Sequence, residues 1–259
     1  MSLLKCLSAM AFLGVLGSSS AHARGCGDGV PGVLFAGCAE EIVAELVLVA
    51  EGGIRTEAMP RPGQRVVVTG AYTSGERREP EGLFIIDGDA LDPYPQGWDG
   101  VALIDGQGRL SLHHAERIDV GNERFDLRRK ASRRAFARTA KMQGWSAFQS
   151  HMLVIDGKVD TRPREGAPRF SRRLLYVLED GSIGLYETLP MTLNDAAIAV
   201  SKALSPVMAM NLDMGSYDYC RIERDVIRNC GALIPSQTGK LSNLLVLSHR
   251  TAETAAVAE

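Results

Sequence analysis

The stretch Ala209-Met210-Asn211-Leu212-Asp213-Met214-Gly215-Ser216-Tyr217-Asp218-Tyr219-Cys220 decides how the rest of this chain is interpreted. The apolar run Val207 to Met210 is typical of a short buried strand. The six residues from Asp213 to Asp218 then bring together two acids, a glycine and a hydroxyl. A strand is a rigid platform that can hold such groups in a cleft, so we expect a functional site here. The alternative is a polar strand-to-turn junction with Gly215 at a positive φ.

The segment from Asn211 to Ser216 also resembles a known signature. Asn-Leu-Asp-Met-Gly-Ser is similar to the Leu-Asp-Gly-Gly-(Gly)-Ser motif of the phosphodiester glycosidase domain family, with Met214 in place of one glycine. The resemblance implies that Asp213 is catalytic and that Gly215 and Ser216 contact the substrate. A carboxylate at this point can protonate a leaving oxygen, activate water or stabilise charge at the anomeric carbon. Asp218 is a candidate second carboxylate, without support from the resemblance.

An earlier segment resembles the first motif of the same family. That motif is a strand ending in Asn-x-Gly-x-Phe/Tyr, followed by Pro-x-Gly-Leu and a hairpin. The matching residues are Gly70, Tyr72, Pro80, Gly82 and Leu83. Val68 replaces the asparagine, which removes an amide that could bind a sugar or phosphate oxygen. The resemblance implies that Gly70 and Tyr72 bind substrate; a β-meander with glycine turns is the alternative.

Two further segments follow in the family's order. The run from Phe148 to Lys158 resembles Gln-Ser-x-Pro-x-Leu followed by Asp-Gly-Lys, without the proline. This implies that Gln149 and Ser150 offer neutral hydrogen bonds to sugar hydroxyls. Arg172 falls where the family has the arginine of an Arg-Thr-Ala-x-Gly motif, although the alanine and glycine are replaced. An arginine fork suits a phosphodiester, so Arg172 is expected to act with Asp213 in catalysis; an ordinary surface arginine is the alternative.

The resemblance covers about residues 40 to 220 and implies an α+β fold of mostly antiparallel sheets with a few packed helices, in a single domain from residue 24 to 250. It implies an exported hydrolase that cleaves a sugar from a sugar-1-phosphodiester or a related glycosidic linkage. Two alternatives stay open: a non-catalytic carbohydrate- or anion-binding protein on the same fold, and an envelope protein without a small ligand. We expect no cofactor, because the sequence has no nucleotide-phosphate loop. We also expect no metal, because the adjacent His113 and His114 face opposite ways on a strand and no third ligand lies at metal spacing.

The first residues have the features of a signal peptide. Residues 1–23 combine Lys5, an apolar core and the small-x-small site Ala21-His22-Ala23 before Arg24. We therefore expect a periplasmic or secreted protein without stable membrane insertion after cleavage. The apolar run is short for a bilayer span, and a retained anchor is the alternative. The tail, residues 251–259, is expected to be flexible.

The cysteines that follow the predicted signal form two close pairs. Cys26 lies near Cys38, and Cys220 lies near Cys230, which in an oxidising compartment predicts two local disulfides. Three pairings are formally possible, and the local one is favoured because short loops close easily. A zinc site is the alternative, although these spacings fit no common zinc motif.

The charge pattern argues against a general nucleic-acid binder, because the formal net charge is only −2. One basic stretch, Asp126 to Met142, has apolar residues at helical spacing and predicts a helix with a solvated face; attraction of an anionic substrate, lipid or glycan is the alternative. The clearest predicted helix is Leu193 to Leu204, with Thr192 as its cap. Leu241 to Leu247 predicts a last edge strand. The oligomeric state is left open by the sequence.

Overall fold

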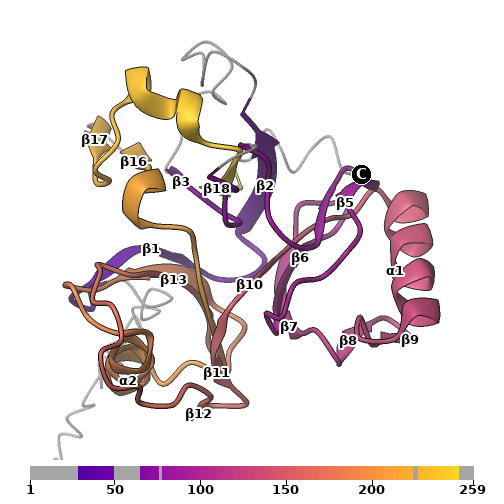
Figure 1. The fold of residues 1–259 in the computed structure, drawn as a ribbon, viewed down its shortest axis with the longest axis horizontal. Helices are drawn as coiled ribbons and strands as arrows, with labels where there is room; N and C mark the ends of the chain where they lie inside the picture. Colours follow the sequence, from indigo (N-terminus) through magenta and orange to yellow (C-terminus); the bar gives the residue numbers. More distant parts are fainter. Residues whose placement is uncertain (1–28, 50–64, 76–77, 224–226, 251–259) are drawn as a thin grey trace, which may run out of the picture.

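The computed structural model describes residues 29–49, 65–75, 78–223 and 227–250. The predicted signal peptide, Cys26 and the tail after Arg250 lie outside these residues. Three antiparallel sheets and two α-helices make up most of the described chain (Figure 1), which confirms the predicted α+β class with mostly antiparallel strands. Within the described residues, no helix combines the length and apolar character that a bilayer span requires.

The first sheet carries the C-terminal half of the predicted site. Its strands follow the order β1 (Val33–Gly37), β14 (Ile183–Glu187), β13 (Arg173–Val177), β15 (Met208–Asn211), β11 (Met152–Ile155) and β12 (Lys158–Val159). The strand predicted at Val207 to Met210 is therefore present as β15. It lies inside the sheet, between β13 and β11, which fixes the position of the acid-bearing segment that follows it.

The second sheet carries the Gln-Ser motif. Its order is β5 (Asp89–Asp92), β4 (Phe84–Ile86), β10 (Ser146–Ser150), β6 (Gly100–Ile104) and β7 (Leu110–His114). Beside it, β8 (Ile118–Val120) and β9 (Glu123–Phe125) form a two-stranded hairpin. Gln149 and Ser150 are the last residues of β10, and the chain passes from there into β11 of the first sheet. This crossing brings the two sheets together at the predicted site.

The third sheet has the order β17 (Ile227–Asn229), β16 (Cys220–Glu223), β3 (Arg65–Val68), β18 (Asn243–His249) and β2 (Ile42–Leu48). The prediction of an edge strand near Leu241 to Leu247 is wrong in one respect. Strand β18 pairs with β3 on one side and with β2 on the other. It is interior because β2 and β3, from the other end of the sequence, cover both of its edges.

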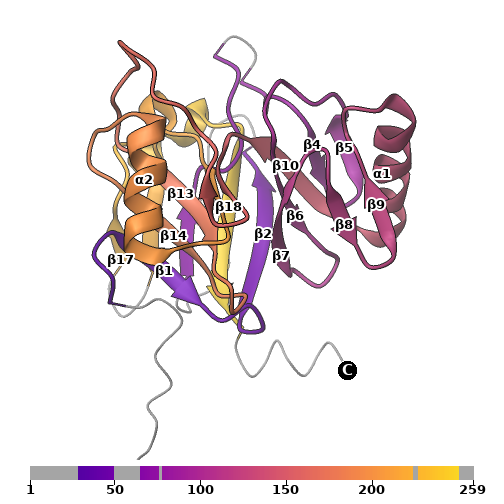
Figure 2. The same cartoon turned by 90° about the horizontal axis from the view of Figure 1, so that it is seen from below.

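The two helices cover different sheets at opposite ends of the molecule (Figures 1 and 2). Helix α1 (Lys130–Gln143) packs Phe136 and Ala140 on the second sheet. Helix α2 (Leu193–Leu204) packs Ala196, Ala197 and Val200 on the first sheet. Its predicted cap is confirmed, since the Thr192 hydroxyl accepts a hydrogen bond of 3.1 Å from the Asp195 N–H.

The main hydrophobic core lies where the three sheets face one another. It includes Phe148 of β10, Met210 of β15 and Leu245 of β18, one from each sheet. The 3₁₀ turn η2 (Gly215–Tyr217) leads from the first sheet into the third, and η3 (Pro235–Lys240) precedes β18. The site motifs, which are far apart in the sequence, therefore lie at strand ends around one shared core.

Candidate functional site

Asp213 lies two residues beyond the end of β15, against the segment that follows β3. Its N–H donates a hydrogen bond of 3.1 Å to the Gly70 carbonyl, and its carboxylate accepts one of 3.0 Å from the Thr73 N–H. The residue is 5% exposed. Two predicted site segments that lie more than a hundred residues apart in the sequence are thus hydrogen-bonded to each other.

The buried position changes the acidity of Asp213. Burial raises its pKa to about 7, although hydrogen bonds from Thr73 and the Met214 backbone act in the opposite direction. The charge of Glu81 raises it further. A carboxyl group whose pKa lies near the working pH can exchange protons in either direction, which is the property required of a general acid or base.

Tyr72 stands beside Asp213 at the centre of the predicted residues. Its hydroxyl accepts a hydrogen bond of 2.7 Å from the Asn211 side-chain amide and also hydrogen-bonds to Ser150. Burial raises the pKa of Tyr72, and the charges of Asp213 and Arg172 act on the same hydroxyl. The structure therefore gathers Tyr72, Ser150, Arg172 and Asp213 from four separate segments.

Three rings form one side of this region. Tyr72 and Trp98 have ring centroids 4.6 Å apart, and the His151 ring lies 6.0 Å from Tyr72 and 5.7 Å from Trp98. All three side chains are only partly buried. Such rings suit the apolar face of a sugar. Burial lowers the pKa of His151, as does the charge of Arg172, whereas Asp99 raises it.

The sequence analysis assigned no role to Trp98, His151 or Asn211. The chain holds only two tryptophans, and Trp98 lies in the segment Gly97-Trp98-Asp99 just before β6, which was a usable signal for a ring outside the core. Asn211 is the first residue of the motif from Asn211 to Ser216, but only the acid, Asp213, and the residues after it were given roles. Its Nδ2 donates to the Leu212 carbonyl as well as to Tyr72, while its Oδ1 is buried without a partner among the described residues.

Gln149 is fully buried and faces a loop of the protein instead of an open site. Its Oε1 accepts hydrogen bonds from the Gln96 N–H at 2.8 Å and the Leu83 N–H at 3.3 Å. Its Nε2 donates to the carbonyls of Gln96 and Trp98. These four bonds use the hydrogen-bonding capacity of the side-chain amide and hold the segment from Gln96 to Trp98 in place. A substrate contact by Gln149 stays a prediction.

The predicted glycines have different environments. A Cβ at Gly70 would lie 2.8 Å from Asn243 Oδ1, so the close packing of β18 requires glycine there. Gly215 has a φ of +76° and open space around it, which agrees with the turn interpretation. Gly215 and Ser216 are exposed at η2. Substrate contacts by Gly70, Gly215 and Ser216 stay predictions.

Arg172 comes directly before β13 and is 9% exposed. Its guanidinium donates to the carbonyls of Met191 at 3.5 Å and Pro168 at 3.3 Å and lies 5.2 Å from the centre of the Phe170 ring. Burial lowers its pKa, and the charge of the Tyr72 hydroxyl raises it. Arg172 is thus a buried cation next to the candidate site.

Asp218 is not placed as the second carboxylate of the site. It accepts a hydrogen bond of 3.0 Å from Arg173, and its other oxygen accepts one of 3.0 Å from the Ala232 N–H. Arg173 is fully buried and also donates to Glu187 at 2.6 Å. Asp218 therefore stabilises the structure, whereas Glu81, which sequence reasoning did not single out, is the carboxylate whose charge reaches Asp213.

The disulfide between Cys220 and Cys230 is confirmed. It closes the segment that follows η2 and ties β16 to the end of β17. Cys38 is also disulfide-bonded, but its predicted partner Cys26 lies outside the described residues, so that pairing stays a prediction. In the described part of the chain, no group of three or more His, Cys, Asp or Glu side chains is arranged to hold a metal ion.

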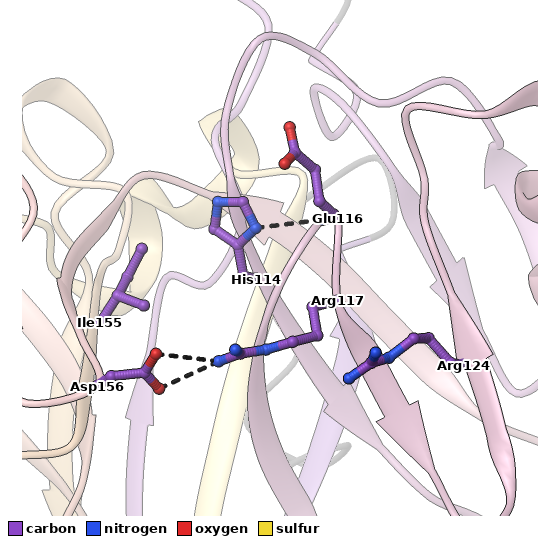
Figure 3. A pocket seen from close by; sticks show the side chains of 6 residues that line it. All are labelled: His114, Glu116, Arg117, Arg124, Ile155 and Asp156. Carbon is purple, nitrogen blue, oxygen red and sulfur yellow. Dashed lines mark hydrogen bonds and ion pairs between the residues drawn. The ribbon is translucent and has the colours of Figure 1, made fainter.

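A separate pocket of about 380 Å³ contains Asp156, the acid of the Asp-Gly-Lys motif (Figure 3). Arg117 donates two hydrogen bonds of 3.1 Å to the Asp156 carboxylate across this pocket. Arg124 is paired with Asp119. Both arginines here are paired with carboxylates. Asp156 lies in a hairpin turn with a φ of +48°. None of the residues that line this pocket belongs to the Asp213 site.

Comparison with known proteins supports the fold. The sequence matches no protein-family model and no curated protein sequence. The structure is similar to the catalytic domain of zebrafish N-acetylglucosamine-1-phosphodiester alpha-N-acetylglucosaminidase, auto-inhibited by its pro-peptide. The TM-score is 0.51 at 13% identity, over 82% of this chain and 74% of that chain. At this identity the likeness concerns the fold alone.

Two other solved structures are similar at lower scores. A hypothetical protein from Synechocystis has a TM-score of 0.48 at 10% identity, over 81% of this chain and 57% of that chain. A protein from Burkholderia pseudomallei described as exported has a TM-score of 0.46 at 14% identity, over 82% of this chain and 73% of that chain.

Proposed function

We propose that this chain is an exported hydrolase that cleaves the bond between the anomeric carbon of a sugar and the oxygen of a phosphodiester. The observation that carries the proposal is the position of Asp213, a buried carboxyl group with a pKa of about 7, beside Tyr72. The Tyr72 hydroxyl also feels the charge of Arg172, and its ring belongs to the set of three rings. The fold likeness to a catalytic domain named for a sugar-1-phosphodiester substrate supports the same substrate class.

The two charged groups divide the reaction between them. A phosphodiester oxygen is a weak base, so it leaves without needing a proton but benefits from a nearby cation. Arg172 supplies that positive charge, and its planar fork matches two phosphate oxygens. Asp213, in its ionised form, accepts the proton of the attacking water.

The bonds change in one displacement. The water oxygen forms a bond to the anomeric carbon, and the bond from that carbon to the phosphate oxygen breaks, its electron pair leaving with the phosphate. The water proton moves to Asp213 and is later released to solvent. Trp98, Tyr72 and His151 hold the sugar by stacking and exclude competing water from one face.

Export agrees with two features of the chain. The Cys220–Cys230 disulfide is of the kind that persists in oxidising compartments. The predicted signal peptide before Arg24 would direct the chain there. N-terminal sequencing of the protein isolated from its host would test this part: an uncleaved Met1 would contradict it.

The test of activity uses purified protein and a panel of glycosyl phosphodiesters and simple alkyl glycosides. The wild type is expected to release sugar from the phosphodiesters and to leave alkyl glycosides intact, because an alkoxide leaves poorly without an acid. Asp213→Asn keeps the shape and removes the base, so turnover should fall by about a thousandfold or more.

The matched control is Asp156→Asn, an identical change in the pocket of Figure 3, which should leave turnover unchanged. A wild type that binds these compounds but turns over none of them would overturn the hydrolase proposal. It would favour the non-catalytic binding protein on the same fold.

A further inference from the structure

A pocket of about 380 Å³ has Arg172 in its wall. Its walls come from the segment that links β12 to β13 and from the first turn of α2. The residues that line it are Thr161, Arg162, Arg164, Ala167, Pro168, Arg172, Thr192, Leu193 and Asn194. Three of these nine are arginines, and none is an acid, so the pocket is strongly positive.

Arg172 is the informative member of this group. In the described part of the chain it forms no ion pair with a carboxylate, although it is 9% exposed. Its guanidinium has the Phe170 ring at 5.2 Å and two backbone carbonyls at 3.3 and 3.5 Å, which are long contacts for a charged donor. A cation buried without a counter-ion is costly, and an anionic ligand at this position would supply the missing charge.

Arg162 and Arg164 add positive charge to the same pocket. Both are exposed, and neither forms an ion pair within the described ranges. Three acids lie close by. Glu165 follows Arg164 in the chain, is exposed and forms no ion pair within the described ranges. Asp195 is paired with Arg169 at 3.4 Å, and the charge of Arg162 acts on Asp160, whose pKa is raised mainly by burial.

The pocket adjoins the Asp213 site through Arg172. The charge of Arg172 acts on both the Tyr72 hydroxyl and the His151 ring, while the same side chain lines the pocket. A ligand phosphate bound at Arg172 would therefore have its sugar on the side of the rings and the rest of its leaving group in the pocket.

We propose that this arginine pocket binds the leaving group of the substrate and selects leaving groups that carry a second negatively charged phosphate. Either a pyrophosphate linkage or a chain of repeating phosphodiesters meets this requirement. This inference rests on the proposed function for which end of the substrate lies in the pocket. The preference of the pocket for anions does not depend on turnover and can be measured by binding alone.

The first experiment measures binding alone. Inorganic pyrophosphate and inorganic phosphate are titrated into the full mature chain by calorimetry at low salt. Pyrophosphate is expected to bind more tightly than phosphate. Arg162→Gln and Arg164→Gln should each weaken pyrophosphate binding by about fivefold, as for one exposed ion pair, and should change phosphate binding by less than about twofold.

The matched control is Arg138→Gln, which makes the same charge change on α1 at the other end of the molecule (Figure 1). It should leave both affinities within about twofold of the wild type. Equal losses in all three variants would mean a general charge effect and would overturn the inference. Equal affinity for phosphate and pyrophosphate would also overturn it.

The second experiment compares turnover of a glycosyl methyl phosphodiester with that of a glycosyl diphosphodiester and a short glycosyl phosphodiester oligomer. Arg162→Gln and Arg164→Gln should lower kcat/KM for the two longer substrates by about fivefold and spare the methyl compound. Equal loss on all substrates would overturn the pocket inference while leaving the hydrolase proposal standing. Selective pyrophosphate binding without any turnover would support the pocket and overturn the hydrolase proposal.

Discussion

The side-chain amide of Asn211 donates a hydrogen bond of 2.7 Å to the hydroxyl of Tyr72, which lies 139 residues earlier in the chain. This bond joins the end of β15 to the segment after β3. It holds the Tyr72 ring against Trp98 and places its hydroxyl next to Ser150 and the charge of Asp213. The bond therefore couples the two halves of the candidate site.

Tyr72→Phe keeps the ring and removes this acceptor. Because the Asn211 amide is buried, we expect a loss of about 1–2 kcal/mol in the free energy of unfolding, measured by urea denaturation. Tyr94→Phe is the control, since Tyr94 is 69% exposed and should change stability by less than about 0.5 kcal/mol. Equal effects of the two substitutions would show that the Tyr72 hydroxyl has no structural role.

Asp213 makes stability depend on pH in a predictable direction. Its folded pKa of about 7 lies above the ordinary value of 3.8, so between these values the folded state holds a proton that the unfolded state has lost. The free energy of unfolding therefore falls as the pH rises toward 7, by up to about 4 kcal/mol in total. Above pH 7 it no longer changes with the ionisation of Asp213. Asp213→Asn removes this dependence.

The check is urea denaturation of the wild type and Asp213→Asn at pH 5 and pH 7.5. The variant should gain about 2–3 kcal/mol relative to the wild type between these two values. If the free energies of unfolding of the variant and the wild type differed by the same amount at both pH values, Asp213 would already be ionised at pH 5.

Under the hydrolase proposal, the pH dependence of kcat/KM reports the same group. A general base acts when ionised, so kcat/KM should rise with pH through about 7. Glu81→Gln removes a nearby negative charge, which lowers the pKa of Asp213 and should move the midpoint of this rise to lower pH. A falling limb in place of the rise would assign Asp213 the role of an acid.

Arg173 is expected to be among the most sensitive positions for stability. It is fully buried and binds Glu187 at 2.6 Å and Asp218 at 3.0 Å. Arg173→Met leaves two carboxylates without their partner and should cost about 3–5 kcal/mol, seen as a lower Tm by circular dichroism. Arg169→Met breaks only the exposed pair with Asp195 and should cost less than about 1 kcal/mol. Similar Tm values for the two variants would contradict this account.

Local patterns in the sequence were sufficient to predict one helix, two hairpins and one disulfide. Helix α2 forms over the predicted residues because its cap, its apolar face and its end before Pro206 are all encoded within a few positions. The hairpins β6–β7 and β13–β14 likewise follow from apolar arms around glycine turns. The Cys220–Cys230 disulfide follows from a short loop.

Residues whose role depends on distant partners could not be assigned in this way. Gln149 was expected to meet a sugar, but the backbone from Gln96 to Trp98 takes up its amide. Strand β18 was expected at an edge, but β2 and β3 enclose it. In both cases the deciding groups come from elsewhere in the chain, and periodicity says nothing about which strands become neighbours.

Arg172 and Arg173 show the division between sequence and tertiary structure most directly. The sequence by itself determined that two adjacent arginines precede a strand and that neighbouring side chains there take different directions. The β13–β14 hairpin already sets Glu187 opposite Arg173. Only the tertiary structure decided that Arg173 also meets Asp218 beyond η2, while Arg172 lies without a carboxylate partner, among the described residues, in the wall of a pocket. The physical reason is that local geometry sets the direction of a side chain, whereas its charge partner is set by which distant segments pack beside it.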